Sequence, residues 1–488
     1  MSSFRLLDLM KPFGSIIPEI EISLGKSEFD DKIIYTFVSC FIYLLLQFPI
    51  VGVKVAEQLS IKDPFYWLRP IFGSEKGTLL EFGLLPILTS AFLWQLAAGN
   101  RLLNVNFTLK SDRLLFQTLQ KLTSVFLSFI YSILLVSSGY FDSSVGNPLS
   151  LTTLALIVAQ ITLTTLFVTL LVELIDKGYG FSSGVLSLLT IAIASNFAYN
   201  TIGIQVLKTA RGFESVGSLV NLMKNIRTKP LGSAIISSFN RLNFSNLNQF
   251  YITIITFAIV MYLANFRFEL TIKSTKVRSM SQSYPIKLLF CGSLPILFTF
   301  TVLYNLNIFG YAISRKMASN TLVKTFLADY DIISSSSIHY ELTSGLLYYL
   351  SPSPIYNSII SKFLQTIIYS FFIITTSISF SKTWSSVSGS SGNDLSKTFK
   401  EQGISILGYR DSAITKELNK VIPTASITGA GILSLIVAFS ELFGGYGLPV
   451  SVTVGITSGL TILESIMSEW QQNGDKNSSF AQVFNPNQ

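Results

Sequence analysis

Long stretches without a charged residue alternate with shorter polar segments along most of the chain. Ten stretches are long enough to cross a hydrocarbon core of about 30 Å, which takes about 20 helical residues. None of them contains Asp, Glu, Lys, Arg or His. They are residues 33–53, 82–100, 122–141, 143–172, 178–207, 242–266, 288–314, 363–381, 421–440 and 442–463. The pattern predicts an all-α membrane protein with ten transmembrane helices and both termini on one side.

An eleventh charge-free run, residues 342–361, breaks at Ser351-Pro352-Ser353-Pro354 and is expected to be re-entrant or to lie at the surface. Acidic residues between 19 and 31 leave no room for a cleavable signal peptide, so the first span acts as the insertion signal. Before it, the spacing of Leu6, Leu9, Met10 and Phe13 predicts a short helix on the membrane surface.

Composition agrees with a membrane protein, because 49% of the 488 residues are hydrophobic and only 13% are charged. Ordinary soluble domains carry about 25% charged residues. Lys and Arg are somewhat more numerous on the side that holds the termini, which places both termini in the cytosol by the positive-inside rule. The bias is small, because segment 208–241 adds basic residues to the opposite side.

Two of the expected cytosolic loops, 267–287 and 382–420, are basic. From Phe266 apolar and polar residues alternate, which predicts a strand outside the membrane and a turn at Ser274-Thr275. The hairpin would carry Lys273, Lys276 and Arg278 at its tip, and the second loop carries Arg410. Such residues can bind lipid or nucleic acid phosphates, although charge alone favours a simple role in topology.

Residues suited to catalysis or metal binding are scarce. Cys40 and Cys291 both fall within apolar stretches, and the single histidine, His339, has no second ligand nearby, so neither a metal nor another cofactor is expected. Residues 180–184 read GFSSG, a literal GxSxG, but the only histidine lies in a loop expected across the membrane. No phosphate-binding GxxxxGK motif is present. We therefore expect a protein that is not an enzyme.

Several short strings resemble one known family. They are DPFYWLR at 63–69, GTLLEFG at 77–83, ELIDKGYGFSSG at 173–184, STKVR at 274–278, YPIKL at 284–288, FSKTW at 380–384 and KELNKVIPTAS at 416–426. In this order and spacing they resemble the alpha subunit of the eukaryotic Sec translocon, a member of the SecY family, from the N-terminus to about residue 465. Since the strings are kept while the loops between them depart, the chain looks closest to a fungal paralogue.

The resemblance implies a fold of two inverted-repeat halves, 1–207 and 208–488, around an hourglass pore with a plug and a lateral gate. A plug helix would fall within 61–74, with Asp63-Pro64 as a plausible start. The pore ring would consist of six aliphatic residues, Leu84, Leu88, Val185, Leu189, Leu297 and Val454. Aliphatic side chains offer no ligands to hydrated ions, so a narrow ring blocks leakage, although any one of them could simply be packing.

The same resemblance implies a polar contact at the lateral gate, between Asn305 of the seventh span and Thr89 and Gln95 of the second. For Thr89 and Gln95, a structural role between packed helices is about equally plausible. Lys273, Lys276, Arg278 and Arg410 would contact ribosomal RNA phosphates. Tyr409 stands where family members carry another basic residue, and residues 315–341 and the tail after 470 also depart from the family.

These features predict a passive channel that binds translating ribosomes at the endoplasmic reticulum membrane. It would pass signal-bearing nascent polypeptides or release them into lipid, and two small single-span subunits, beta and gamma, are the expected partners. A secondary transporter of a small solute is the alternative, since it also uses inverted repeats. The absence of charged residues from all ten stretches counts against proton coupling.

Overall fold

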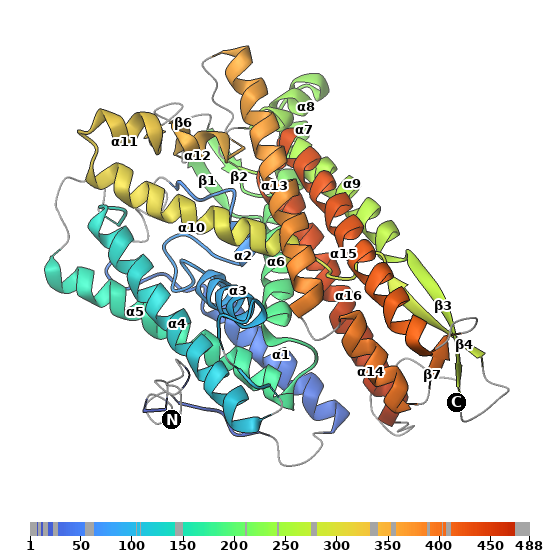
Figure 1. The fold of residues 1–488 in the computed structure, drawn as a ribbon. Helices are drawn as coiled ribbons and strands as arrows, with labels where there is room; N and C mark the ends of the chain where they lie inside the picture. Colours follow the sequence, from blue (N-terminus) through green and yellow to red (C-terminus); the bar gives the residue numbers. More distant parts are fainter. Residues whose placement is uncertain are drawn as a thin grey trace.

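The computed structural model is mostly helical (Figure 1). It describes residues 7, 11–12, 18–22, 28–53, 63–103, 105–107, 109–141, 150–209, 212–241, 244–274, 281–331, 340–352, 358–387, 391–402, 404–406 and 411–473. The expected surface helix at Leu6 to Phe13 lies outside these residues, apart from Leu7 and two turn residues.

Eight helical segments of the described chain are long and apolar enough to cross a membrane. They contain α4 (Lys110–Ser137), α5 (Leu151–Leu174) with the π-helical turn η4 (Ile175–Tyr179), α6 (Gly184–Ile202), α9 (Leu247–Ala264), α10 (Leu294–Lys316), α13 (Ile359–Val387), α15 (Asp411–Leu442) and α16 (Leu448–Asn473). Each coincides with one of the ten expected spans, and Figure 1 shows most of them running alongside one another.

The other two expected spans correspond to shorter helices, α1 (Phe29–Leu45) and α3 (Leu85–Gly99). With 17 and 15 residues, they extend about 25 Å and 22 Å. Their charge-free runs contain non-helical chain as well: Pro49 forms a β-bridge with Thr78, and Gly83 has a positive φ in the turn before α3. A charge-free run therefore overestimates the helix where proline and glycine end it.

Several helices extend beyond the charge-free stretches and include charged residues. α4 begins at Lys110 and includes Lys121, and the span that ends at Tyr179 includes Glu173. The Lys121 ammonium and the Glu173 carboxylate are buried and lie 2.7 Å apart, and Lys177 bonds the other Glu173 oxygen at 2.8 Å. Mutual pairing lets these charges leave water. A pattern that counts only charge-free residues cannot anticipate such a pair.

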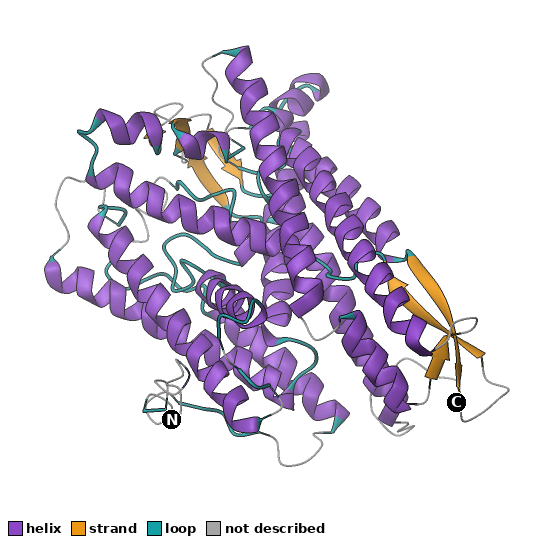
Figure 2. Ribbon diagram, in the orientation of Figure 1, coloured by secondary structure: helices purple, strands orange, loops and turns teal. Residues whose placement is uncertain are grey.

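Within the described residues, strands form three small sheets at the two ends of the molecule (Figure 2). At one end lie β1 (Val206–Thr209) with β2 (Gly212–Ser215), and β5 (Asp329–Asp331) with β6 (Glu341–Ser344). Four short helices accompany them, α7 (Ser218–Thr228), α8 (Leu231–Phe239), α11 (Thr321–Phe326) and α12 (Leu346–Tyr349). The segment after residue 342 thus turns at this end instead of spanning, as its prolines predict.

The opposite end carries the predicted hairpin. β3 (Arg267–Ser274) pairs antiparallel with β4 (Ser281–Lys287), in a register that joins Arg267 to Lys287 and Lys273 to Ser281. The alternating pattern from Phe266 is therefore confirmed as a strand. β7 (Ile404–Ile406), which follows α14 (Gly392–Gln402), pairs with the other edge of β3. The two basic loops are consequently joined in one three-stranded sheet.

Candidate functional site

The six predicted ring residues come from four helices and belong to one extensive hydrophobic cluster. Leu84 caps α3, and Leu88 lies one turn further along that helix. Val185 and Leu189 belong to α6, Leu297 to α10 and Val454 to α16. Five of the six side chains are buried, and Val185 packs against the cluster while partly exposed. All six belong to one cluster that draws on helices from both halves of the chain, and their role as a ring stays a prediction.

The expected plug segment packs into the same cluster. Its helix, α2 (Arg69–Phe72), is only four residues long, and Phe65, Trp67 and Leu68 before it are buried as well. The sequence suggested that this helix starts at Asp63-Pro64, but it starts at Arg69. Instead the Asp63 carboxylate accepts a hydrogen bond from the Phe65 amide at 3.1 Å and forms a local turn, a common alternative to a helix start for Asp.

A buried ion network anchors this segment to the N-terminal half. The Arg69 guanidinium donates to Asp63 Oδ2 at 2.5 Å and to Glu81 Oε1 at 2.6 Å. It also donates to the Tyr140 hydroxyl at 2.9 Å, and that hydroxyl donates to Glu81 at 3.1 Å. Burial opposes ionisation of Asp63, but the adjacent Arg69 holds the pKa of that carboxyl below its usual range. All of these side chains are buried, so water does not solvate their charges. The charges are therefore stabilised by one another.

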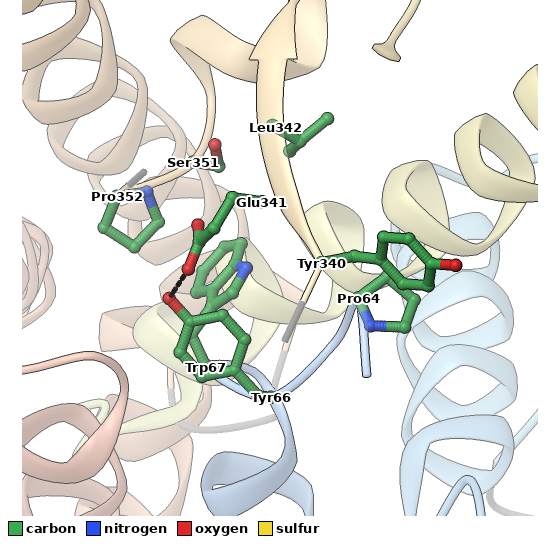
Figure 3. A pocket seen from close by; sticks show the side chains of 8 residues that line it. All are labelled: Pro64, Tyr66, Trp67, Tyr340, Glu341, Leu342, Ser351 and Pro352. Carbon is green, nitrogen blue, oxygen red and sulfur yellow. Dashed lines mark hydrogen bonds between the residues drawn. The ribbon is translucent and has the colours of Figure 1, made fainter. Parts of the chain in front are cut away.

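The C-terminal half holds the same segment through weaker contacts (Figure 3). The Tyr66 hydroxyl donates to the Glu341 carboxylate at 2.7 Å, and the Tyr340 amide donates to the Asp63 carbonyl at 3.2 Å. Burial raises the pKa of Tyr66 well above its usual value, so the hydroxyl keeps the proton that it donates. The cavity between these residues is about 10 Å³, room for one water at most. The segment is thus closely fitted between both halves.

A further close approach involves the turn between α15 and α16. Gly447 has φ +81°, and a Cβ atom there would lie 1.8 Å from the Trp67 carbonyl oxygen. Its amide donates to the buried Glu441 carboxylate at 2.9 Å. Only glycine allows the turn and the plug backbone to touch at this distance.

A contact expected between Asn305 and Thr89 is present between α10 and α3, and its role in a lateral gate stays a prediction. Asn305 Nδ2 donates to the Thr89 hydroxyl at 3.1 Å, and Tyr131 of α4 donates to the Asn305 carbonyl oxygen. Gln95 lies on the same helix as Thr89, and among the described residues no hydrogen bond joins its side chain to Asn305. The structure places Asn305 in contact with Thr89, as expected, and also with Tyr131, which was not expected.

Sequence reasoning missed Tyr131, Glu341 and the Arg69–Glu81–Tyr140 network. A tyrosine in an apolar span carries no distinguishing pattern, whereas Arg69 and Glu81 stand out as charges next to apolar strings. Of the predicted phosphate contacts, Lys273 lies in β3, while Lys276, Arg278 and Arg410 lie outside the described residues. The GxSxG run connects η4 to α6 rather than a strand to a helix, which does not fit a hydrolase elbow.

Comparison with known proteins accounts for this arrangement. A family model described as SecY matches residues 78–469, and one described as the plug domain of Sec61p matches residues 41–77. The chain belongs to the SecY family. Within this family it is 40% identical to the Sec sixty-one protein homolog of Saccharomyces cerevisiae, over 97% of each chain. It is 34% identical to the protein transport protein SEC61 of the same yeast, over 94% of this chain and 95% of that one.

Solved structures of SecY-family channels share the fold. The chain in the idle yeast Ssh1 complex bound to the yeast 80S ribosome is 38% identical, with a TM-score of 0.77 and 99% of both chains covered. A protein-conducting channel of 21% identity aligns with a TM-score of 0.76, over 94% of this chain and 96% of that one. The resemblance seen in the sequence strings is confirmed, and with it the SecY-like fold.

Proposed function

We propose that this chain is the channel-forming subunit of a translocon, which binds ribosomes and moves signal-bearing nascent chains across or into the endoplasmic reticulum membrane. One observation carries the proposal. The expected plug segment and the six aliphatic residues expected to form the ring belong to one hydrophobic cluster that draws on both halves of the chain. The relatives named above are protein transport proteins and ribosome-bound channels, which supports the same activity here and disfavours a small-solute transporter.

Each part of the site has a physical task in this activity. The ring of Leu84, Leu88, Val185, Leu189, Leu297 and Val454 excludes hydrated ions while the plug fills the space beside it. A signal helix that enters between α3 and α10 replaces the Asn305–Thr89 bond with its own apolar contacts to lipid. Separation of the halves then removes the Tyr66–Glu341 contact and frees the plug to move.

Release of a segment into lipid is a partition and needs no catalytic group. Each central Leu, Ile or Phe favours the lipid by about 0.3–0.6 kcal/mol, whereas Lys or Asp opposes it by about 2.5–3.5 kcal/mol. A segment with enough apolar residues leaves through the gate, and a polar segment continues through the ring. We expect the chain to have no enzymatic activity, so elongation by the ribosome or a partner supplies the driving force.

The partners follow from the same proposal. Both termini and the β4–β3–β7 sheet lie in the cytosol, where Lys273, Lys276, Arg278 and Arg410 meet ribosomal RNA phosphates. The opposite end, with α7, α8 and α12, lies in the lumen. Two small single-span subunits, beta and gamma, accompany the channel, and lipid borders its gate.

Photocrosslinking tests the proposal directly. A photoreactive residue replaces Leu84 or Leu297 in microsomes that carry stalled ribosome–nascent chain complexes with a signal sequence. Since both side chains are fully buried at the junction of the halves, they should crosslink to the nascent chain, and the crosslinks should vanish on release with puromycin.

A matched probe at Phe257 of α9 provides the control, because this side chain is 47% exposed on a span outside the ring. It should crosslink to lipid and not to a hydrophilic nascent chain. If Leu84 and Leu297 crosslink no better than Phe257 while the protein is integrated and ribosomes are bound, the pore assignment is wrong and the transporter becomes the better hypothesis.

A further inference from the structure

The helix pair α7–α8 has its polarity reversed relative to a helix pair in a water-soluble protein. Its buried residues are small or polar, namely Ser218, Asn221, Ala234 and Ser238. Its large apolar residues point outward: Met223 is 70% exposed, Leu231 65% and Ile236 63%. Ile226, Ile235 and Phe239 are exposed as well. Helices in water bury such side chains, so water is an unsuitable solvent for this face.

Hydrogen bonds inside the pair fix this orientation. The Asn225 amide donates to the Ser238 hydroxyl at 3.2 Å, which ties α7 to α8 through their polar faces. Ser238 in turn donates to the Ala234 carbonyl at 2.9 Å. Rotating either helix to hide its apolar residues would break the interhelical contact. The apolar face is therefore a fixed property of the folded pair.

The exposed face continues onto a membrane span. Leu231, Ile235 and Phe239 form one stripe along α8, and the Phe239 ring stacks on Tyr251 of α9 with centroids 6.2 Å apart. Beyond Tyr251, α9 presents exposed Ile254, Ile255 and Phe257, as expected of a helix that faces lipid. In Figure 1, α7 and α8 lie at the same end of the molecule as the first turns of α13. The stripe thus lies where the spans leave the membrane.

The polar rim of the pair is basic. Lys224, Arg227 and Lys229 occupy α7 and the link to α8, and residues 215–241 contain no Asp or Glu. Arg227 and Lys229 are exposed, whereas Lys224 donates to the Phe213 carbonyl at 2.9 Å. Cations beside an apolar face are the arrangement that suits phospholipid phosphates above acyl chains.

From this arrangement we infer that α7–α8 is an interfacial anchor. The pair lies in the lumenal headgroup region, with Leu231, Ile235, Ile236 and Phe239 among the acyl chains and Arg227 and Lys229 at the phosphates. The pair α7–α8 lies in the connection between the last span of the N-terminal half and the first span of the C-terminal half. It therefore fixes the depth of this connection while the halves separate.

The rival occupant is the span of a small protein partner. The basic rim argues for lipid, because a hydrophobic span offers nothing to pair with Arg227 and Lys229.

Depth-dependent fluorescence quenching tests the anchor in the full chain. A single cysteine replaces Ile236 in a chain whose Cys40 and Cys291 are alanine, and it carries an environment-sensitive fluorophore. The matched control places the cysteine at Ser233, an exposed polar residue on the same helix. Both proteins are measured in phospholipid vesicles, with lipids that bear a shallow nitroxide and with aqueous iodide as separate quenchers.

The nitroxide should quench the label at position 236, which should be protected from iodide, and the reverse should hold at position 233. Iodide quenching at both positions with none by the nitroxide would overturn the anchor. The measurement is repeated in native microsomal complexes that contain the partner subunits. If the nitroxide quenches the label at position 236 in vesicles but not in those complexes, a protein partner covers this face. That outcome would also overturn the anchor.

Discussion

Asn305 of α10 donates a hydrogen bond to Thr89 of α3 across the two halves, and its carbonyl oxygen accepts a bond from Tyr131 of α4. The same Asn305 amide donates to the Thr301 carbonyl of its own helix at 2.8 Å. The asparagine is thus satisfied only while α3, α4 and α10 stay together. In the proposed gate, opening would exchange these bonds for contacts with lipid or a signal helix.

Removing the partners of Asn305 should make the gate open more readily. The variants Tyr131→Phe and Thr89→Val each leave part of the Asn305 amide without a partner in the closed state. Interhelical hydrogen bonds in membranes contribute about 0.6–2 kcal/mol, so the closed state should lose about 3- to 30-fold in population. Weakly hydrophobic signal sequences should then be translocated more efficiently, as measured with a reporter series of graded hydrophobicity.

Thr162→Val provides a matched control for this prediction. The Thr162 hydroxyl bonds only to carbonyls of its own helix, at Val158 and Ala159, so its loss should leave the hydrophobicity threshold unchanged. A threshold that shifts equally in all three variants would mean that the gate bonds have no special role.

Breaking the Arg69 network should loosen the plug. The substitution Arg69→Met removes the guanidinium that pairs with the buried carboxylates of Asp63 and Glu81, and loss of one partner of a buried pair costs about 3–5 kcal/mol. We expect a larger ion conductance of the resting channel in planar bilayers. Arg113→Met, which removes an exposed arginine of α4, should leave the conductance unchanged.

A second variant separates this effect from general misfolding. The triple substitution Arg69→Met, Asp63→Asn and Glu81→Gln removes the unpaired charges together with the cation. Its resting conductance should fall back toward that of the native chain. A triple variant as leaky as Arg69→Met would show that packing, and not charge pairing, holds the plug.

How much the sequence could predict depends on the kind of interaction. Apolar runs and the alternation after Phe266 are local patterns, so the spans and the β3 hairpin followed from them. Lys121 and Glu173 are distant in sequence and pair with each other inside the bundle, so a rule that treats each charge separately could not identify them as partners. The short α1 and α3 were overestimated because charge-free runs ignore the turns at Pro49 and Gly83.

The site shows the same division. Its aliphatic ring residues were identified by resemblance to a family, and without the family strings dozens of other aliphatic residues would have been equal candidates. Tyr131 and Glu341 act through partners 174 and 275 residues away in the chain. Only the folded structure brings such pairs together, which is why neither was predicted.

The closed position of the plug should become more stable, relative to the released one, between pH 8 and about pH 10. Lys76 lies in the stretch 41–77 that the plug-domain model matches, and burial lowers its pKa to about 8 in the closed state, whereas an exposed lysine titrates near about 10.4. Between these values the released plug binds more protons than the seated one, so the seated state gains stability as the pH rises. Resting conductance should therefore fall from pH 7.5 to 9.5. In Lys76→Met this change should disappear, and a persistent one would point to another group.

Ribosome binding should depend on the β4–β3–β7 sheet through charge. The triple substitution Lys273→Glu, Lys276→Glu and Arg278→Glu adds repulsion from ribosomal RNA and should weaken binding of empty ribosomes to microsomes. Each lost phosphate contact should lower the slope of log affinity against log salt by about 0.7–0.9, because fewer counterions are released. Lys229→Glu, at the opposite end of the molecule, should change neither quantity. If the triple variant kept the native slope, the hairpin would not contact phosphates, and its basic residues would serve topology alone.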